Sequence, residues 1–333
     1  MKVIVPISNL SIDRPFNLCN IRFEPELPDD IYLGIKDVDP ISYYETEEGE
    51  VLNWNLRDMN TFVTDVDIEE ISNMTLAIFD FDYNYEDLYE HSHEDDLMLI
   101  SRISEKVDRA LDVIRVHYCN VNNLMTCPGI SGLLPNGYSA VIALYPDDEA
   151  NYRILTGKIY GSLIVGGIGL SLEDREIFTL MDEEKFSKIV SDQSNDYVPL
   201  TCRNALKRLS EAMYIPNVNS KFIYLMTTLE TIASPKYLAF QKVKGKLLPF
   251  ISESKKQYDE LSDYMRFLSE DLRTEVVHNG KDLIQIRGAK YKTDLFNIQS
   301  FIVRCVDYMY SSACKSIDEL ESYRTELRKK LGV

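Results

Sequence analysis

The spacing of apolar residues changes near residue 190, and this change most limits what the chain can fold into. Before it, short runs at residues 2–7, 16–24, 31–36 and 74–83 are rich in β-branched and aromatic residues and are bounded by Pro, Asp and Asn, which predicts strands. After it, apolar residues recur almost everywhere at helical spacing. We therefore predict an α+β protein, with a mixed α/β N-terminal domain followed by an all-α helical bundle.

The element boundaries follow from the same patterns. In the first half, apolar residues at helical spacing predict an amphipathic helix over residues 94–118, and strand-like runs follow at 138–146 and 152–172. In the second half, helices are expected at 201–214, 217–234, 236–251, 254–278, 294–315 and 316–331. The polar segment SDQSNDYVPL ends in a proline and is interpreted as a linker. A chain of 333 residues suits two domains, which we place at residues 1–192 and 198–333.

The distribution of charged residues also changes between the two halves of the chain. Residues 1–200 hold 38 acidic and 14 basic residues, whereas residues 201–333 hold 16 acidic and 22 basic residues. The acidic half would repel a polyanion, and the basic half could bind one. Two domains that simply have different surfaces would give the same division, so the charge pattern alone leaves both interpretations open.

Other sequence features concern location. No run of 18 apolar residues exists, so no membrane span is expected, and the N-terminal apolar stretch is too short and too polar in its flanks for a secretory signal. The six cysteines show no paired spacing, which favours reduced thiols and a cytoplasmic protein.

The stretch DLRTEVVHNGKD combines an arginine, Arg273, with a histidine, His278, directly before an Asn-Gly pair that is typical of a helix end. Five residues of helix rise about 7.5 Å and turn about 140°, so both side chains can reach one substrate near that end. An arginine that bridges two helices and a histidine that caps a C-terminus would give the same spacing.

The context of this pair resembles the HEPN family, in particular its Apea-like branch, over about residues 200–320. The pair matches the family's R-x4-to-6-H motif, and KFIYLMTTLETIAS resembles its second helix, on which Glu230 would face the motif. The residue after the motif arginine is usually Asn, Asp or His in the family, and here it is Thr274. The resemblance implies a small all-α bundle for the C-terminal domain.

The resemblance also implies metal-independent RNA cleavage, in which a 2′-hydroxyl attacks the adjacent phosphate and leaves a cyclic phosphate. The residue types suit that chemistry. Histidine transfers protons near neutral pH, and a guanidinium can hold the oxygens of a phosphorane. Because this half supplies one histidine per chain, we predict a homodimer whose motif helices meet in one cleft, with no metal and no cofactor.

Several basic residues are candidates for contacts with the RNA backbone outside that cleft. They are Lys242, Lys244, Lys246, Arg287, Lys290 and Lys292. Tyr291 could stack on a base, although a tyrosine in a core or on a plain surface is the commoner case.

Three other segments attract attention. The first is a possible metal site, formed by His91, His93, Glu94, Asp95 and Asp96 with help from His117, Cys119 and Cys127. Structural zinc sites show tighter paired spacing, so an acidic solvated loop is the default interpretation of this segment. The segment DVDIEE at 65–70 is expected to begin a helix. The glycines in YGSLIVGGIGLSLEDRE, residues 160–176, are interpreted as bends in a strand.

Two functional hypotheses result. The first is an endoribonuclease that serves as a toxin or phage-defence effector, with an N-terminal domain that senses a protein or phage-derived trigger or restrains the nuclease. The second is a non-catalytic bundle for dimerisation and partner binding. Binding of a nucleotide or small ligand by the bundle is a third and more remote option.

Overall fold

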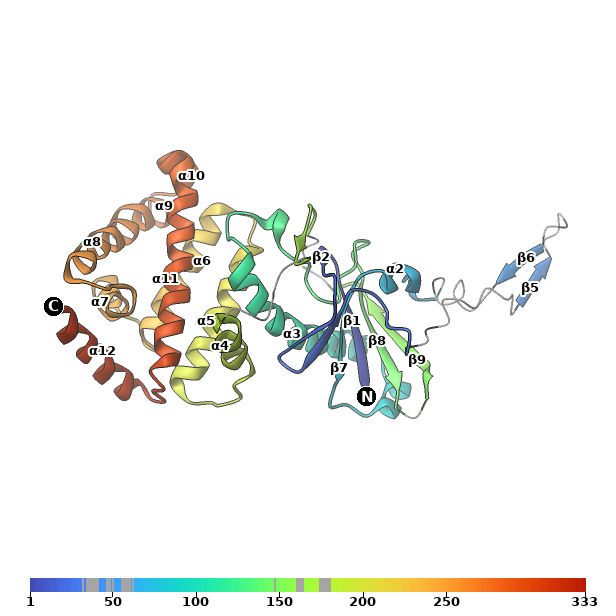
Figure 1. Cartoon of the computed structure of the whole chain (residues 1–333). Helices are drawn as coiled ribbons and strands as arrows, with labels where there is room; N and C mark the ends of the chain where they lie inside the picture. The colour runs from blue at the N-terminus through green and yellow to red at the C-terminus, as the bar shows by residue number, and fades with distance from the viewer. Residues whose placement is uncertain are drawn as a thin grey trace. The chain divides into compact units, whose positions relative to one another are not determined.

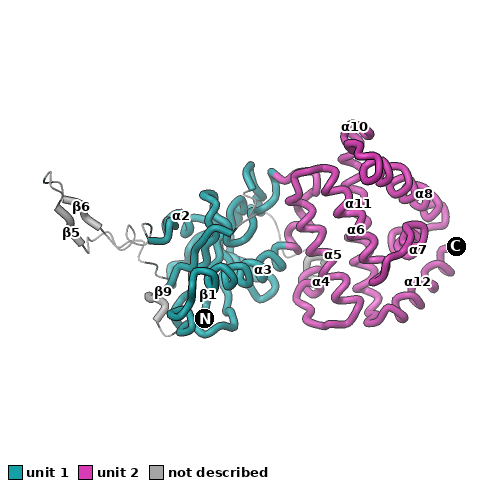
Figure 2. The backbone as a smooth tube through the Cα atoms, turned by 180° about the vertical axis from the view of Figure 1, so that it is seen from behind, with its two compact units in different colours: residues 1–111, 125–179 teal, residues 112–124, 180–333 magenta. Residues whose placement is uncertain are grey.

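The structure is a computed structural model that describes residues 1–31, 33, 42–45, 49, 51–54, 61, 63–146, 148–159, 165–173 and 181–333 (Figure 1). The chain divides into two compact units (Figure 2). The first contains Met1–Leu111 and Met125–Thr179, and the second contains Asp112–Leu124 and Leu180–Val333. Most of the expected strand at 31–36 lies outside the described residues, as do residues 160–164 and 174–176 of the glycine-rich segment.

A six-stranded sheet forms the first unit, and every neighbouring pair in it is antiparallel. Its order is β3 (Phe16–Leu18), β4 (Ile21–Glu24), β7 (Thr75–Asp80), β1 (Lys2–Ile7), β8 (Ser139–Tyr145) and β9 (Asp148–Gly157). Two small pairs accompany it, β2 (Leu10–Ser11) with β10 (Leu170–Ser171) and β5 (Ser42–Glu45) with β6 (Val51–Trp54). The α+β class is therefore confirmed, with an antiparallel sheet as its β part.

Both faces of this sheet are buried, which explains why β1 and β8 are almost entirely apolar. Side chains alternate between the faces along each strand. One set, which includes Ile4 and Ile142, packs against Ile68 and Ile71 of the short helix α2 (Ile68–Ser72). Helix α3 (His93–Tyr118) lies across the other face (Figures 1 and 2). The helix predicted at 94–118 is confirmed.

Helix α2 begins where the acidic segment DVDIEE predicts a helix start. The Asp67 side chain accepts a hydrogen bond from the backbone N–H of Glu69 at 2.9 Å, and Glu69 and Glu70 lie in the first turn. Acidic residues there stabilise a helix because its N-terminal N–H groups lack backbone partners.

The second unit is built from helices. They are α4 (Met181–Ser191), α5 (Tyr197–Met213), α6 (Val218–Ala233), α7 (Phe240–Ile251), α8 (Lys255–Arg266), α9 (Thr274–Val277), α10 (Leu283–Arg287), α11 (Tyr291–Ser311) and α12 (Ile317–Leu331). Helix α11 packs against α5, α6 and α7, and α12 packs against α5 and α7. The predicted helix at 217–234 is confirmed with its expected cap, because the Asn217 side chain accepts from the N–H of Ser220 at 2.9 Å.

The end of α3 and the loop after it belong to the second unit. Buried Arg115 pairs with Asp112 at 3.2 Å and donates to the hydroxyl of Tyr214 at 2.8 Å. In the loop, the N–H of Val121 donates to the side chain of Gln299 at 3.0 Å. The structural division thus differs from the predicted domains at 112–124 and at 180–192, because a linear domain boundary takes no account of a segment that packs against elements far along the chain.

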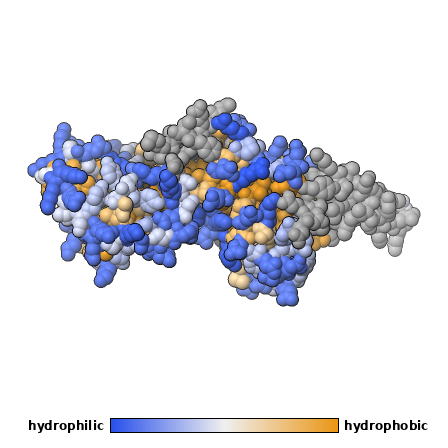
Figure 3. Space-filling view, turned by 60° about the horizontal axis from the view of Figure 1, so that its bottom comes forward, coloured by the Kyte–Doolittle hydropathy of each residue, from blue (hydrophilic) through white to orange (hydrophobic). Residues whose placement is uncertain are grey.

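Figure 3 shows the hydropathy of one face of the molecule. On this face, hydrophobic surface gathers on the first unit, and the surface of the second unit is largely hydrophilic. Within the part of the chain that the structure describes, no helix has both the length and the apolar character needed to cross a membrane.

Candidate active site in the helical unit

The helical segment that carries the Arg-His motif is irregular. Helix α8 continues into a π-helical segment, η3 (Phe267–Arg273), and this passes into α9. His278 ends α9, and Gly280 follows with a φ of 62°, a left-handed conformation that glycine adopts without strain. The helix predicted at 254–278 therefore exists, but with wider winding over the seven residues that end at Arg273. Such π-segments occur frequently at functional sites.

Arg273 is held by Glu230 of α6. Its guanidinium donates a hydrogen bond to Glu230 Oε1, and the two groups form an ion pair. The side chains are 31% and 21% exposed, so the guanidinium is anchored at one edge and still reachable from solvent. The two residues that the family resemblance paired are thus in contact.

His278 and Thr274 are both exposed. The backbone N–H of His278 donates to the carbonyl of Thr274 at 2.9 Å, and the imidazole makes no hydrogen bond or ion pair with any described residue. Among the described residues, no hydrogen bond links the side chain of Arg273 to that of His278. In one copy, the motif therefore presents an anchored cation and an accessible imidazole as separate groups.

Glu275, between the two motif residues, has local partners. Lys281 forms an ion pair with it, and the Asn279 side chain donates to it at 2.9 Å. The Lys281 hydrogen bond first, and then that of Asn279, hold the pKa of the Glu275 carboxyl below its usual value. These contacts tie the loop after α9 back to the motif helix.

Three of the six candidate phosphate contacts are occupied by protein partners. Lys244 is buried and donates to the hydroxyl of Ser262 at 3.1 Å. Arg287 makes two hydrogen bonds to Asp294, at 2.7 and 3.2 Å, and its guanidinium lies 4.8 Å from the centre of the Phe267 ring. These two residues hold helices together.

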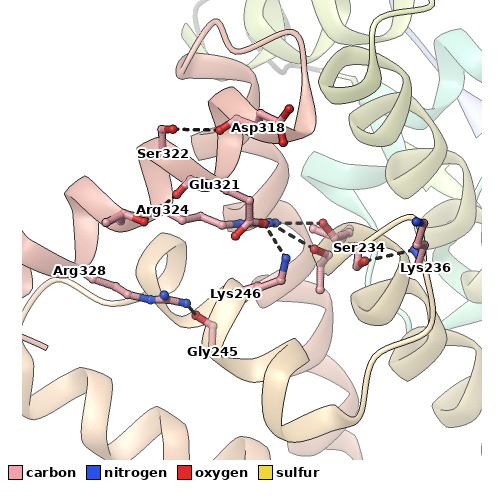
Figure 4. Close-up of polar contacts among 12 residues, drawn as sticks. Ser234, Lys236, Gly245, Lys246, Asp318, Glu321, Ser322, Arg324 and Arg328 are labelled. Carbon is pink, nitrogen blue, oxygen red and sulfur yellow. Dashed lines mark hydrogen bonds and ion pairs between the residues drawn. The ribbon is translucent and has the colours of Figure 1, made fainter.

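Lys246 is the third, and Figure 4 shows its surroundings. Its ammonium lies 2.6 Å from Glu321, which also pairs with Arg324. The Arg324 guanidinium is fully buried and donates to the carbonyls of Ala233 at 3.2 Å and Ile232 at 3.3 Å, at the C-terminal end of α6. Lys246 therefore belongs to a network that fastens α12 to α6 and α7.

The remaining three candidates, Lys242, Lys290 and Lys292, are exposed, and their amino groups make no ion pair with a described side chain. Tyr291, at the first position of α11, is half-buried. These three lysines are the ones in the predicted set that remain available to a phosphate.

The histidine-rich segment of the first unit is a hydrogen-bonded network. His91 lies 2.7 Å from the hydroxyl of Tyr83 and 2.8 Å from Asp96, and Asp96 also pairs with Arg153. Elsewhere, the His117 ring packs against Phe186, and Cys119 and Cys127 are buried. Among the described residues, no group of three or more His, Cys, Asp or Glu side chains is placed to hold a metal ion.

Sequence reasoning missed the pairing of Glu275 with Lys281 and the cluster of tyrosines beside His93 in the first unit. The tyrosine cluster had a signal in the sequence, because FDYNYEDLYEH places four aromatic residues among acidic ones.

Comparison of the chain with known families, with characterised proteins and with solved structures found no match.

Proposed function

We propose that the chain is a HEPN-type, metal-independent endoribonuclease whose acidic N-terminal unit senses a trigger or restrains the nuclease. One observation carries the proposal. Glu230 anchors the Arg273 guanidinium at the surface, five residues before an exposed imidazole at the end of the same helical segment. Phosphodiester transfer uses a fixed cation and an accessible acid-base group, and the segment carries one of each.

In the proposed reaction, one imidazole accepts the proton of the 2′-hydroxyl, and the oxygen attacks the neighbouring phosphorus. The bond from phosphorus to the 5′-oxygen breaks, and a second imidazole, in its protonated form, gives that oxygen a proton. Arg273 stabilises the extra negative charge on the phosphorane oxygens. Since His278 is the only histidine of the helical unit apart from His117, which packs against Phe186, the second imidazole comes from a second copy.

The test is RNA cleavage by the purified full-length protein in the presence of EDTA. We expect the wild type to cleave and His278→Ala to lose at least about a hundredfold in rate, the usual contribution of a general acid or base. His93→Ala, which removes an exposed histidine of the first unit, is the matched control and should leave the rate unchanged. Cleavage by both the wild type and His278→Ala, or by neither, would remove His278 from the mechanism.

The homodimer has its own test. The mass of the full-length protein in solution should equal that of two chains at concentrations where it cleaves RNA. A cysteine in place of Lys281, close to the motif, should form a disulfide between the two copies. Full activity of a single copy would contradict the shared cleft.

The second candidate function is a bundle kept for dimerisation or partner binding. Two exposed apolar side chains close to the motif in the sequence favour it: Val277 of α9 and Ile284 of α10, each more than two-fifths exposed. Thr274, in place of the usual Asn, Asp or His, agrees with it. Replacing Val277 and Ile284 by Ser would then abolish association, and His278→Ala would have no effect on any activity.

A further inference from the structure

Strand β9 is the outermost strand on its side of the six-stranded sheet (Figure 1). Its inner edge pairs with β8, in a register that sets Leu155 opposite Val141 and Ile154 opposite Ile142. No described strand pairs with its outer edge. An open edge of this kind carries backbone N–H and C=O groups with which a strand from another chain can pair.

The hydrogen bonds of β8 show which residues of β9 direct their backbone groups outward. The N–H of Ala140 in β8 donates to the carbonyl of Gly132 at 2.7 Å, and the N–H of Gly132 donates to the carbonyl of Pro6 in β1 at 2.8 Å. Ala140 is therefore bonded on the side away from β9. Residues opposite each other in an antiparallel pair alternate between those that exchange hydrogen bonds and those that do not. Thr156, opposite Ala140, is of the second kind, and so is Ile154, two residues earlier, so both point their N–H and C=O groups to the open edge.

A cavity of about 730 Å³ lies along this edge, and it is lined by side chains from both faces of β9. Ile154 packs on the face that contains the core around α2, and Arg153 lies on the opposite face, where it contacts Asp96 of α3 at 3.0 Å. Two other lining side chains, Val63 and Tyr89, are 76% and 69% exposed. Because successive side chains of a strand point to opposite faces, a cavity that reaches both faces opens around the edge between them. An occupant of this cavity therefore lies in the plane of the sheet, beside the outward backbone groups.

The wall on the Arg153 side is aromatic. It is formed by Tyr145 and by η1 (Tyr85–Glu90), to which Arg153 is fixed by a hydrogen bond to the carbonyl of Leu88. The centre of the Tyr85 ring is 5.1 Å from that of Tyr145 and 6.1 Å from that of Tyr89, with the rings at 83° and 79°. The faces of such rings attract the ammonium or guanidinium group of a basic side chain.

The surroundings of this wall are acidic. Residues 82–101, which supply η1 and the start of α3, hold seven acidic residues and neither lysine nor arginine. Glu86 and Glu90 are exposed and form no ion pair with a described residue. Of the basic side chains in the lining, Arg153 is paired with Asp96, and His93 is the other. The excess of negative charge favours a basic occupant.

We propose that β9 binds an extended, basic segment of a partner protein, which adds a strand to the sheet. The backbone of the segment pairs with Ile154 and Thr156. Its alternate side chains point to the two faces, so that apolar residues meet Ile154 and basic residues meet the tyrosines and the carboxylates of η1. A second copy of this chain suits the edge less well, because it would bring two acidic η1 segments to one interface. The binding does not depend on the chemistry at Arg273 and His278.

The experiment measures, by calorimetry, binding of synthetic peptides to the full-length protein. The peptides have ten residues, the length of β9, and alternate lysine with valine, leucine or phenylalanine. At least one should bind with a dissociation constant below about 1 mM. Two altered forms of that peptide serve as controls. One has glutamate in place of lysine, and the other keeps its side chains but has N-methyl groups on alternate backbone nitrogens. Both should bind at least about tenfold more weakly.

Variants of the protein locate the binding. Ile154→Pro removes an outward N–H, leaves the hydrogen bonds to β8 in place, and should weaken binding about tenfold. Ile154→Val keeps that N–H and should bind as the wild type does. Glu86→Lys should weaken binding about threefold, as expected for the loss of one exposed ion pair. Glu326→Lys makes the same change of charge at an exposed residue of the second unit and should have no effect.

Hydrogen exchange of the backbone N–H groups, followed by NMR, tests the pairing in the wild type itself. The N–H groups of Ile154 and Thr156 should exchange more slowly when the peptide is bound, whereas that of Leu155, already bonded to β8, should exchange slowly in both states. The proposal is overturned if none of the three lysine peptides binds, if either control peptide binds as tightly as its parent, or if Ile154 and Thr156 exchange equally fast with and without peptide. A wild-type dimer that Ile154→Pro converts to single chains would place a second copy at the edge and would also overturn it.

Discussion

The guanidinium of Arg273 donates to the carboxylate of Glu230, and this ion pair links a π-helical segment to the neighbouring helix α6. Both side chains remain partly exposed, and pairs of this kind contribute about 0–1 kcal/mol to stability. We therefore expect the ion pair to act mainly by holding the Arg273 guanidinium in one orientation. A positioning role of this kind predicts that catalysis depends on the pair more than folding does.

Replacing Glu230 with Ala tests that division. We expect the turnover number for RNA cleavage to fall about tenfold with little change in KM, because the cation remains but is no longer directed. The free energy of unfolding should change by less than about 1 kcal/mol. Glu253→Ala breaks a comparable exposed ion pair, with Arg304 at 2.9 Å, and is the matched control. An unchanged turnover number in Glu230→Ala would contradict the positioning role.

The salt dependence of RNA binding should separate the free lysines from the occupied ones. Removal of Lys242, Lys290 or Lys292 should each lower the slope of log K against log salt concentration by about 0.7, as expected for one phosphate contact on a single strand. Fluorescence anisotropy of labelled RNA over a range of KCl concentrations measures this slope. Lys246→Ala should leave the slope unchanged, since that ammonium is engaged by Glu321. Equal slopes for all four variants and the wild type would rule out these lysines as phosphate contacts.

Acid should weaken the attachment of α12 through Glu321. Burial is the largest single influence and acts to raise the pKa of this carboxyl, but the hydrogen bonds and charges of Lys246 and Arg324, which contact it (Figure 4), together outweigh burial, so the pKa lies below its usual value. A depressed carboxyl pKa gives stability that is present above the unfolded-state pKa of about 4.3 and is lost as pH falls through the folded-state pKa.

Urea unfolding at pH 7 and at successively lower pH measures this loss. Glu321→Gln should unfold more easily than the wild type at neutral pH and approach it in acid. Glu326→Gln, which changes an exposed residue of the same helix, should parallel the wild type at every pH. A constant difference between Glu321→Gln and the wild type at all pH values would show that the charge of Glu321 does not act as described.

Local signals in the sequence were sufficient for many elements. Asn217 predicts the start of α6, and Ser316 with Glu319 forms a capping box at the start of α12, where a helix was expected from residue 316. The apolar run of β1 and the apolar repeat of α3 are equally local. Each of these depends on residues a few positions apart, which a sequence displays directly.

Features that depend on distant partners were not predictable in this way. Lys246 and Lys242 are equivalent in the sequence, but only Lys246 meets a carboxylate from α12. The π-helical winding before Arg273 leaves the apolar repeat nearly unchanged and so has no clear sequence signal.

The chemistry of the cleaved ends tests the central claim most directly. RNA incubated with the full-length wild type in EDTA should carry a cyclic phosphate on one side of each break and a 5′-hydroxyl on the other, and His278→Ala should produce neither end. Breaks that carry a 5′-phosphate, or cyclic phosphate ends that persist at the wild-type rate in His278→Ala, would contradict an imidazole-driven attack by the 2′-hydroxyl.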